Sequence, residues 1–362
     1  MNAQIKLRLK ESVGITTSQE NQTVEFFKSN TRESTIIEVN HPNLVNLLKL
    51  FNGKRTIKEI SDLNQNISAK QLYDIAEFLK RESILIEQDC LYPESIVLHN
   101  RRLINNLEDY FSSTSKVIQA IEDIRSSTVM IIGLGAVGSY LAAYLVKLGL
   151  TNLILVDNDK VDKTNIHRQY FFEEQIGKKK AESLRKELQQ INLEAQITII
   201  YKYLDNDFFE TTTLSSDISV IINCSDEPNV DTTSRIIAKY AMKHKIPHIV
   251  GGGYNLHLTL IGQTIIPFHT ACFHCFNHAL TDINNKELSG VRVLHRENRK
   301  LGSFSPLSSI SATLAALDAF KIIIKRYDLL QQVNKRIEFN MRSFEFDSFD
   351  IARNKDCEWC GK

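Results

Sequence analysis

Short segments of different periodicity make up the first 92 residues. Residues 35–39 are typical of a strand, and apolar side chains then recur at helical spacing over residues 44–51, up to Gly53. A second strand is predicted at residues 84–86. Two capping boxes predict helix starts between these segments: Thr56 with Glu59 and Ser68 with Gln71. We therefore expect residues 1–92 to form a winged-helix-like α+β domain.

A different pattern begins at residue 128, after a polar, helical arm over residues 93–127. Continuous apolar runs, typical of central strands in a parallel sheet, then alternate with helical segments. The runs are residues 129–132, 153–156, 197–201, 218–222 and 248–250. The helical segments are residues 138–148, 178–191 and 229–244. This order predicts an α/β domain with a doubly wound, Rossmann-like, mainly parallel sheet.

An antiparallel extension is predicted after Gly253, with a helix over residues 308–325 and a hairpin-like pair at about 337–346. We expect it to belong to the same domain, residues 128–362. The chain of 362 residues is long enough for this two-domain arrangement.

Composition narrows the class of protein. The chain carries 44 basic and 43 acidic residues, a formal charge of +1, and lacks the basic excess usual in proteins that bind nucleic acid or anionic membranes. No apolar run approaches the roughly 18–20 residues of a membrane span, and the first residues lack the apolar stretch of a signal peptide. We expect a cytoplasmic globular protein with no membrane or nucleic-acid partner.

Cysteine spacing predicts a metal site. Six cysteines are too few for a disulfide scaffold, but four of them fall in two pairs with two residues between the members. The pairs are Cys272 with Cys275 and Cys357 with Cys360. In a reducing compartment this spacing favours a tetrahedral thiolate site for structural Zn²⁺ over disulfides.

Residues 133–138 form a glycine loop between a predicted strand and a predicted helix. Without Cβ atoms the backbone can approach a phosphate closely, and the helix start supplies free N–H groups. Asp157 ends the next strand, 19 residues after Gly138, where a carboxylate can accept hydrogen bonds from a ribose. The pattern predicts a nucleotide site without separating NAD from ATP. Its expected binding residues are Gly133, Gly135, Ala136, Gly138 and Asp157.

The polar residues that follow favour ATP. Asn165, Arg168 and Gln169 come soon after the acidic residue, and Lys180 lies at the start of a helix. A guanidinium and an ammonium that converge on phosphates suit a nucleotidyl transferase, because charge builds on the triphosphate as pyrophosphate departs. Hydride transfer has no such need. Asp226 follows a predicted strand, where its carboxylate can hold Mg²⁺ on the phosphates.

This combination resembles the ubiquitin-activating-enzyme-like adenylyltransferases, the family of ThiF, MoeB and MccB. The resemblance covers about residues 98–362. It rests on residues 133–138, 157, 165–169, 177–180 and 226 and on the two cysteine pairs. It implies ATP binding by the glycine loop and Asp157, and a structural zinc on the four cysteines. It implies further roles on the triphosphate, with phosphate contacts from Asn165, Arg168 and Lys180 and a Mg²⁺ ligand in Asp226.

Two positions depart from the family pattern. Ala136 replaces a glycine that is usual in the loop. Members also carry an Arg-Tyr-x-Arg motif whose second arginine enters a partner subunit's site; here Arg102 matches the first position and Asn105 falls on the second. Homodimerisation is expected from the resemblance alone.

The implied reaction is attack by a carboxylate on the α-phosphate of ATP, with pyrophosphate leaving. A carboxylate is already ionised at neutral pH, so the reaction needs no general base, and we expect Arg168, Lys180 and Asp226 to carry the catalysis. Family members that form a thioester use a cysteine after the first cysteine pair, but none occurs between Cys275 and Cys357. The remaining thiols, Cys90 and Cys224, are typical of buried structural cysteines, so thioester transfer is disfavoured.

The first domain favours a peptide substrate. Residues 47–60 resemble PqqD-type domains, which bind the leader segment of ribosomal precursor peptides at a sheet edge. Such a domain joined to an adenylating domain is the arrangement of the microcin C-type and pantocin-type peptide-modifying enzymes. The leading hypothesis is ATP-dependent adenylation of a carboxyl group on a ribosomal precursor peptide in antibiotic biosynthesis. The alternatives are activation of a ubiquitin-like sulfur carrier and an NAD-sensing, DNA-binding regulator.

Overall fold

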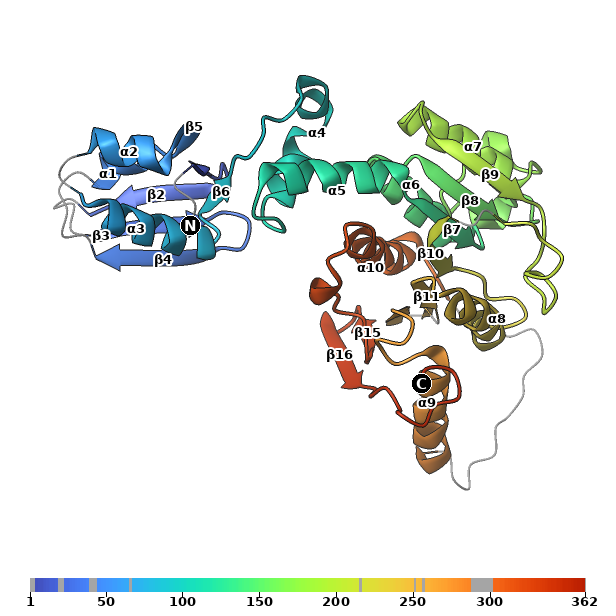
Figure 1. Cartoon of the computed structure of the whole chain (residues 1–362). Coiled ribbons are helices and arrows are strands. Elements are labelled where there is room, and N and C mark those ends of the chain that lie inside the picture. The colour runs from blue at the N-terminus through green and yellow to red at the C-terminus, as the bar shows by residue number, and fades with distance from the viewer. Residues whose placement is uncertain are drawn as a thin grey trace. The chain divides into compact units, whose positions relative to one another are not determined.

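The computed structural model describes residues 4–18, 23–38, 44–64, 67–214, 217–250, 252–255, 258–287 and 302–361. The chain forms two compact units, Met1–Glu122 and Asp123–Lys362 (Figure 1). The predicted strand at residues 35–39 ends in Val39, which lies outside the described residues.

The first unit contains two three-stranded antiparallel sheets and a helical layer that share one core. Its sheets have the orders β5-β1-β6 and β2-β3-β4. The strands are β1 (Lys6–Leu9), β2 (Val13–Thr17), β3 (Thr23–Lys28), β4 (Glu33–Glu38), β5 (Asn52–Thr56) and β6 (Leu85–Glu87). The helices are α1 (Leu44–Leu48), α2 (Ile57–Leu63) and α3 (Ala69–Arg81). Both predicted capping boxes are present, with Thr56 accepting from Glu59 N and Ser68 from Gln71 N.

One local prediction in this unit is wrong. The helix expected up to Gly53 ends at Leu48, and residues 52–56 form strand β5 instead. Gly53 has φ +76°, and a Cβ there would lie 2.2 Å from Gln88 Oε1. The glycine therefore serves a left-handed bend inside a strand, not a helix end.

Two helices follow the first sheets, α4 (Glu94–Leu107) and α5 (Thr114–Ser126). The end of α4 is fixed to β1, since the buried Glu108 carboxylate pairs with Arg8 and accepts from Tyr92 Oη at 2.9 Å. Asp89 caps α5 by accepting from Ser115 N at 2.9 Å. Residues 94–122 thus belong to the first unit by their contacts.

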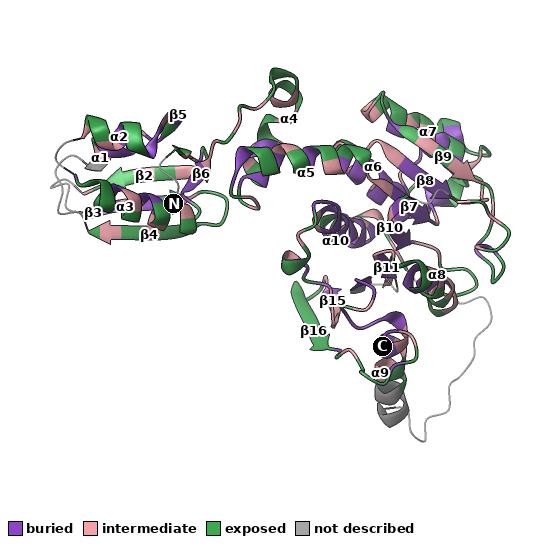
Figure 2. Ribbon diagram, in the orientation of Figure 1, coloured by how far each residue is buried: buried purple, intermediate pink, exposed green. Residues whose placement is uncertain are grey.

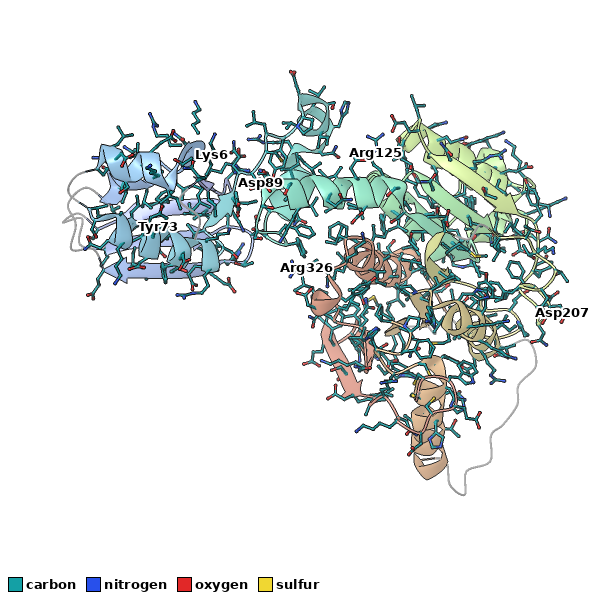
Figure 3. All side chains as sticks on the ribbon, viewed as in Figure 1. Lys6, Tyr73, Asp89, Arg125, Asp207 and Arg326 are labelled. Atoms are coloured by element: carbon teal, nitrogen blue, oxygen red, sulfur yellow. The ribbon has the colours of Figure 1, made fainter. Side chains whose placement is uncertain are left out.

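The last turn of α5 belongs to the second unit. Arg125, labelled in Figure 3, lies in this turn. It pairs with Glu194 at 2.8 Å, and its carbonyl oxygen accepts from Asn152 Nδ2 at 3.1 Å. The boundary between the two units therefore lies inside a helix.

A six-stranded sheet with the order β14-β11-β10-β7-β8-β9 forms the centre of the second unit. Its strands are parallel except for the edge strand β14, which pairs antiparallel with β11. The strands are β7 (Thr128–Ile132), β8 (Asn152–Val156), β9 (Gln196–Ile200), β10 (Ile218–Asn223), β11 (His248–Val250) and β14 (Gln263–Ile265). The connecting helices are α6 (Gly138–Lys147), α7 (Lys180–Ile191) and α8 (Val230–His244). The doubly wound, mainly parallel sheet predicted from the apolar runs is confirmed.

Burial explains why these strands could be recognised. Val129, Met130, Ile131 and Ile132 of β7 are all at most 1% exposed, so the strand is apolar on both faces (Figure 2). α10 (Ser305–Ile323) packs on the same core. It is long and apolar enough to cross a membrane, but 61% of its apolar stretch is buried inside the fold.

The predicted antiparallel extension is a sheet with the order β12-β13-β15-β16. Its strands are β12 (Gly253–Asn255), β13 (Leu258–Ile261), β15 (Lys335–Asn340) and β16 (Glu345–Asp350). Helix α9 (Phe273–Glu287), which begins inside the first cysteine pair, was not predicted. Three short 3-10 turns complete the described elements: Lys163–Asn165, Glu173–Gln175 and Tyr327–Leu329.

Candidate active site

A cavity of about 680 Å³ opens at the carboxyl ends of the central parallel strands of the second unit. This edge of a doubly wound sheet is where such folds bind ligands. All the predicted nucleotide-site residues except Gly138 line the cavity: Gly133, Gly135, Ala136, Asp157, Asn165, Arg168, Gln169, Lys180 and Asp226. Segments far apart in the sequence therefore meet around one space, as the motif spacing predicts.

Each of the three positions in the loop needs glycine for a different structural reason. Gly133 has φ +89°, and a Cβ there would lie 2.6 Å from the Cys224 backbone. A Cβ on Gly138 would lie 2.0 Å from Gly133 O, so this glycine permits the helix to pack on the loop. A Cβ on Gly135 would meet only Gln169 Nε2, at 4.0 Å, and would otherwise occupy the cavity. Gly135 is thus the position that leaves room for a ligand.

Asp157 connects the glycine loop to the segment after β8. Its Oδ2 accepts from Leu134 N at 2.7 Å and its Oδ1 accepts from Asp159 N at 2.7 Å. Burial raises the pKa of Asp157, and the Lys180 charge and the two N–H groups oppose that rise. The carboxylate therefore orders the backbone around the cavity, in addition to the ribose contact that the sequence predicts for it.

Lys180 is the most enclosed cation of the site, with 8% of its side chain exposed. Its Nζ donates to Asp159 Oδ2 at 2.9 Å, and Tyr203 Oη donates to Asp159 Oδ1 at 3.0 Å. Burial alone would raise the pKa of Asp159, but Lys180 and Tyr203 hold it below its usual range. Lys178, two residues earlier, is exposed, so the lysines at residues 178–180 differ in how far they are buried.

The Asn165–Gln169 segment supplies three more polar side chains. Asn165 is buried, and the Arg168 guanidinium donates to Thr164 O while interacting with the Tyr254 hydroxyl. Gln169 is buried at the cavity wall, and its Oε1 has no hydrogen-bond partner among the described residues. A buried amide oxygen without a partner is costly, so it is a ready acceptor for a bound ligand.

A hydrogen-bond network positions the loop that carries Asp226. Asn223, at the end of β10, donates through Nδ2 to Thr233 Oγ1 at 2.9 Å and Ser234 Oγ at 3.1 Å. Its Oδ1 accepts from Ser225 N at 3.0 Å. Asp226 directly follows Ser225, so this network fixes the backbone just before it, and its exposed side chain is part of the cavity lining.

Two cysteines, Cys90 and Cys224, lie outside the paired cysteines. Desolvation raises the pKa of Cys224 to about 12, which keeps the thiol protonated at neutral pH. Cys90 lies in the first unit, with its Sγ 3.5 Å from Thr114 Oγ1. Both residues are half-buried, whereas the sequence predicts buried cysteines.

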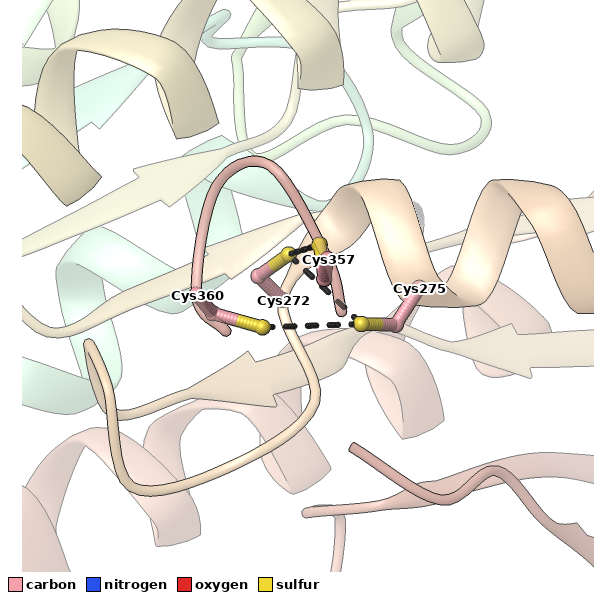
Figure 4. A group of neighbouring side chains, drawn as sticks. All are labelled: Cys272, Cys275, Cys357 and Cys360. Carbon is pink, nitrogen blue, oxygen red and sulfur yellow. Dashed lines mark hydrogen bonds between the residues drawn. The ribbon is translucent and has the colours of Figure 1, made fainter. Parts of the chain in front are cut away.

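The two cysteine pairs meet in one buried cluster (Figure 4). Sγ–Sγ distances are 3.8 Å for Cys272–Cys275, 3.6 Å for Cys272–Cys357 and 3.5 Å for Cys275–Cys360. A disulfide needs about 2.0 Å, whereas four sulfurs about 2.3 Å from a tetrahedral zinc lie roughly 3.8 Å apart. The cluster therefore fits a four-thiolate zinc ion, as the spacing predicts.

The sequence profile of the ThiF family matches residues 111–359, more than two thirds of the chain. The chain belongs to the ThiF family. This match confirms the predicted adenylyltransferase class.

Named relatives agree with the ThiF-family assignment. A molybdopterin-synthase adenylyltransferase from Salmonella typhimurium is 25% identical over 276 residues, covering 75% of this chain and 99% of that protein. A ubiquitin-like modifier-activating enzyme 5 from Drosophila grimshawi is 30% identical over 252 residues, covering 67% of this chain and 61% of that protein. Among solved structures, E. coli MccB has a TM-score of 0.77 at 21% identity, covering 98% of this chain and 97% of that one. PaaA has a TM-score of 0.71 at 19% identity, covering 95% and 100%.

The cavity lining of this ThiF-family chain also includes residues that were not predicted from the sequence, among them Asp159, Tyr203 and Tyr254. Asp159 lies only two residues after Asp157, so its acidic side chain on the same segment was an available signal. The tyrosines carried no such signal, because Tyr203 lies beyond the end of β9 and Tyr254 lies in β12, and only tertiary packing brings them to the cavity.

The loop glycines predict opposite outcomes for one added methyl group. We expect Gly138→Ala to lower the free energy of unfolding by about 2 kcal/mol or more, because its Cβ would overlap Gly133 O. We expect Gly135→Ala to keep wild-type stability but to weaken Mg-ATP binding about tenfold or more, since its Cβ enters the cavity. Thermal unfolding and titration calorimetry measure the two effects. A stable Gly138→Ala, or a Gly135→Ala that binds ATP normally, would contradict the loop geometry.

The cysteine cluster predicts a metal-dependent fold. We expect the wild-type chain to carry about one zinc, and Cys357→Ser to lose it and melt about 10 °C lower, because bound metal contributes folding free energy. Cys90→Ser is the matched control and keeps both zinc and melting temperature, because Cys90 lies outside the cluster. Elemental analysis and thermal unfolding are the measurements. A wild-type protein that is folded and free of zinc would refute the assignment.

Proposed function

We propose that this ThiF-family protein uses Mg-ATP to adenylate a carboxyl group of a ribosomally made precursor peptide. The acyl-adenylate then rearranges, cyclises or is kept as a nucleotide conjugate. In this proposal Zn²⁺ is structural, the enzyme acts in the cytoplasm, and two copies form a homodimer.

The observation that carries the chemistry is the arrangement of charge around the cavity. Loop backbone at Gly135, the guanidinium of Arg168 and the ammonium of Lys180 face one space. A carboxylate oxygen of the substrate attacks the α-phosphorus, the bond from the α-phosphorus to the bridging oxygen breaks, and pyrophosphate leaves with the electron pair. The cations stabilise the charge that builds on the leaving group, and Asp226 would hold Mg²⁺.

No side chain is needed to remove a proton in this step. A peptide carboxylate is ionised at neutral pH, and the cavity offers positioning and charge instead of a nucleophile–base pair. The protonated state of the Cys224 thiol also argues against transfer of the acyl group to that residue.

The first unit supports a peptide as the substrate. It supplies short, half-exposed sheets whose edge strands include β4 and β2, and an extended peptide binds such an edge by adding a strand. E. coli MccB, which matches 98% of this chain, was crystallised with MccA peptide and, separately, with ATP. Because the likeness to MccB extends over both units and not over the adenylating unit alone, it favours the same kind of substrate for this chain.

A sulfur-carrier protein is the second candidate. Its support is the identity of 25–26% to molybdopterin-synthase adenylyltransferase and to the sulfur carrier protein ThiS adenylyltransferase of E. coli. Such a substrate presents a flexible carboxyl terminus to the same cavity, so the nucleotide chemistry is unchanged. The first unit is the feature that separates the two candidates.

We expect pyrophosphate release when the protein, Mg-ATP and the peptide encoded by a neighbouring short reading frame are combined. The peptide should either gain the mass of a retained nucleotide or lose the mass of one water. A peptide with blocked carboxyl groups is the substrate control. Release only with a ubiquitin-like protein that ends in Gly-Gly would establish the second candidate instead.

Lys180→Ala is expected to reduce pyrophosphate release by about 10²-fold or more, because the enclosed ammonium no longer balances phosphate charge. The fold should persist, since the Asp159 carboxylate left behind remains partly exposed. Lys178→Ala is the matched control on the exposed neighbour and should keep wild-type activity. Equal activity of the Lys180 variant and wild type would remove this lysine from the site.

A further inference from the structure

One end of the cavity contains a short chain of hydrogen bonds that begins at Tyr203. The Tyr203 hydroxyl donates to Asp159 Oδ1 at 3.0 Å, and Lys180 Nζ donates to Oδ2 of the same carboxylate at 2.9 Å. Lys180 N also donates to Asp159 O at 3.0 Å. All three side chains line the cavity. The carboxylate is thus engaged at both oxygens, and its second oxygen holds the ammonium.

Other charged groups surround this chain. Lys179 is a second cation that faces Asp159, and the carboxylates of Asp157 and Glu227 face Tyr203. Lys179 does not compete for this carboxylate, because its Nζ donates to Asn158 O and to Asn158 Oδ1 at 2.9 Å. The Tyr203 hydroxyl occupies one oxygen of Asp159 and leaves the other for Lys180. The hydroxyl therefore restricts how the carboxylate can turn and helps to fix the oxygen that holds the Lys180 ammonium.

We propose that Tyr203 is a positioning residue for the phosphates of bound ATP. It fixes the Asp159 carboxylate, which in turn aims the Lys180 ammonium into the cavity. The hydrogen bond to the carboxylate also raises the pKa of Tyr203, which keeps the hydroxyl a donor. The inference rests on the proposed nucleotide site and assigns a role that the motifs of the sequence do not contain.

A second tyrosine two residues earlier provides a matched control. The Tyr201 hydroxyl donates to Glu182 Oε1 at 2.7 Å, also a phenol-to-carboxylate bond. Tyr201 is exposed and is not part of the cavity lining. Loss of its hydroxyl removes an equivalent bond on the same stretch of chain without touching the nucleotide site.

The experiment measures Mg-ATP and adenosine binding to the full-length protein by calorimetry or competition. We expect Tyr203→Phe to weaken Mg-ATP binding about three- to tenfold, the effect of losing one hydrogen bond to a charged group in a partly exposed site, and to leave adenosine binding unchanged. Tyr201→Phe should bind both ligands as wild type does. Equal weakening for ATP and adenosine would overturn the proposal, since the ring would then contact the nucleoside.

A double-mutant cycle tests whether Tyr203 acts through the carboxylate. In the background of Asp159→Asn, the Tyr203→Phe change is expected to cause no further loss of ATP affinity, because the link to Lys180 is already broken. Thermal unfolding of each variant confirms that it is folded. Additive losses in the double variant would overturn the proposal.

Failure of this inference is distinguishable from failure of the proposed function. Wild-type protein that does not bind Mg-ATP would refute the proposed function itself. Wild-type protein that binds Mg-ATP, together with a Tyr203→Phe variant of equal affinity, would refute only the role of Tyr203. Neither result depends on knowing the peptide substrate.

Discussion

The Asp157 carboxylate accepts one backbone N–H from the glycine loop and one from the segment after β8. Two loops that follow different strands are therefore held by a single side chain. Burial penalises this charge and raises the pKa of Asp157, while the Lys180 ammonium and the N–H groups oppose part of that rise. Hydrogen bonds to a charged group are worth about 1.5–3 kcal/mol, so the backbone of the cavity wall is ordered before any ligand arrives. The cradle for phosphate depends on that order.

The charged side chains of the cavity are held in place as well as its backbone. Lys180 lies near the Asp157 carboxylate and donates to Asp159, so its positive charge is balanced within the site. A cation held by fixed partners needs little reorganisation when a triphosphate binds, which is the condition for strong electrostatic stabilisation of a leaving group. The unpartnered Gln169 oxygen and the open space at Gly135 lie on the same cavity wall. An acceptor without a hydrogen-bond partner and an open space thus lie together where the nucleotide is proposed to bind.

The second unit was predictable because its signals are local and strong. The strands at 128–132 and 152–156 are buried on both faces and therefore form unbroken apolar runs, and the glycine loop follows the first of them directly. Strands β1, β2, β3 and β5 of the first unit escaped prediction because none of them is buried on both faces, so none forms an unbroken apolar run. The contact between Asp159 and Tyr203 escaped for another reason. Tyr203 lies 44 residues away along the chain, and only tertiary packing brings the two together.

The cysteine cluster acts on the cavity through the antiparallel sheet. It joins the start of α9 to the last described residues, since Cys357 lies 85 positions after Cys272. Strand β15 lies inside this closed segment and pairs with β13, which pairs with β12. β12 carries Tyr254, whose hydroxyl interacts with Arg168 at the cavity. Closing a long loop restricts the unfolded chain most and keeps β15 in place, so the sulfur cluster stabilises one wall of the nucleotide site without contacting it.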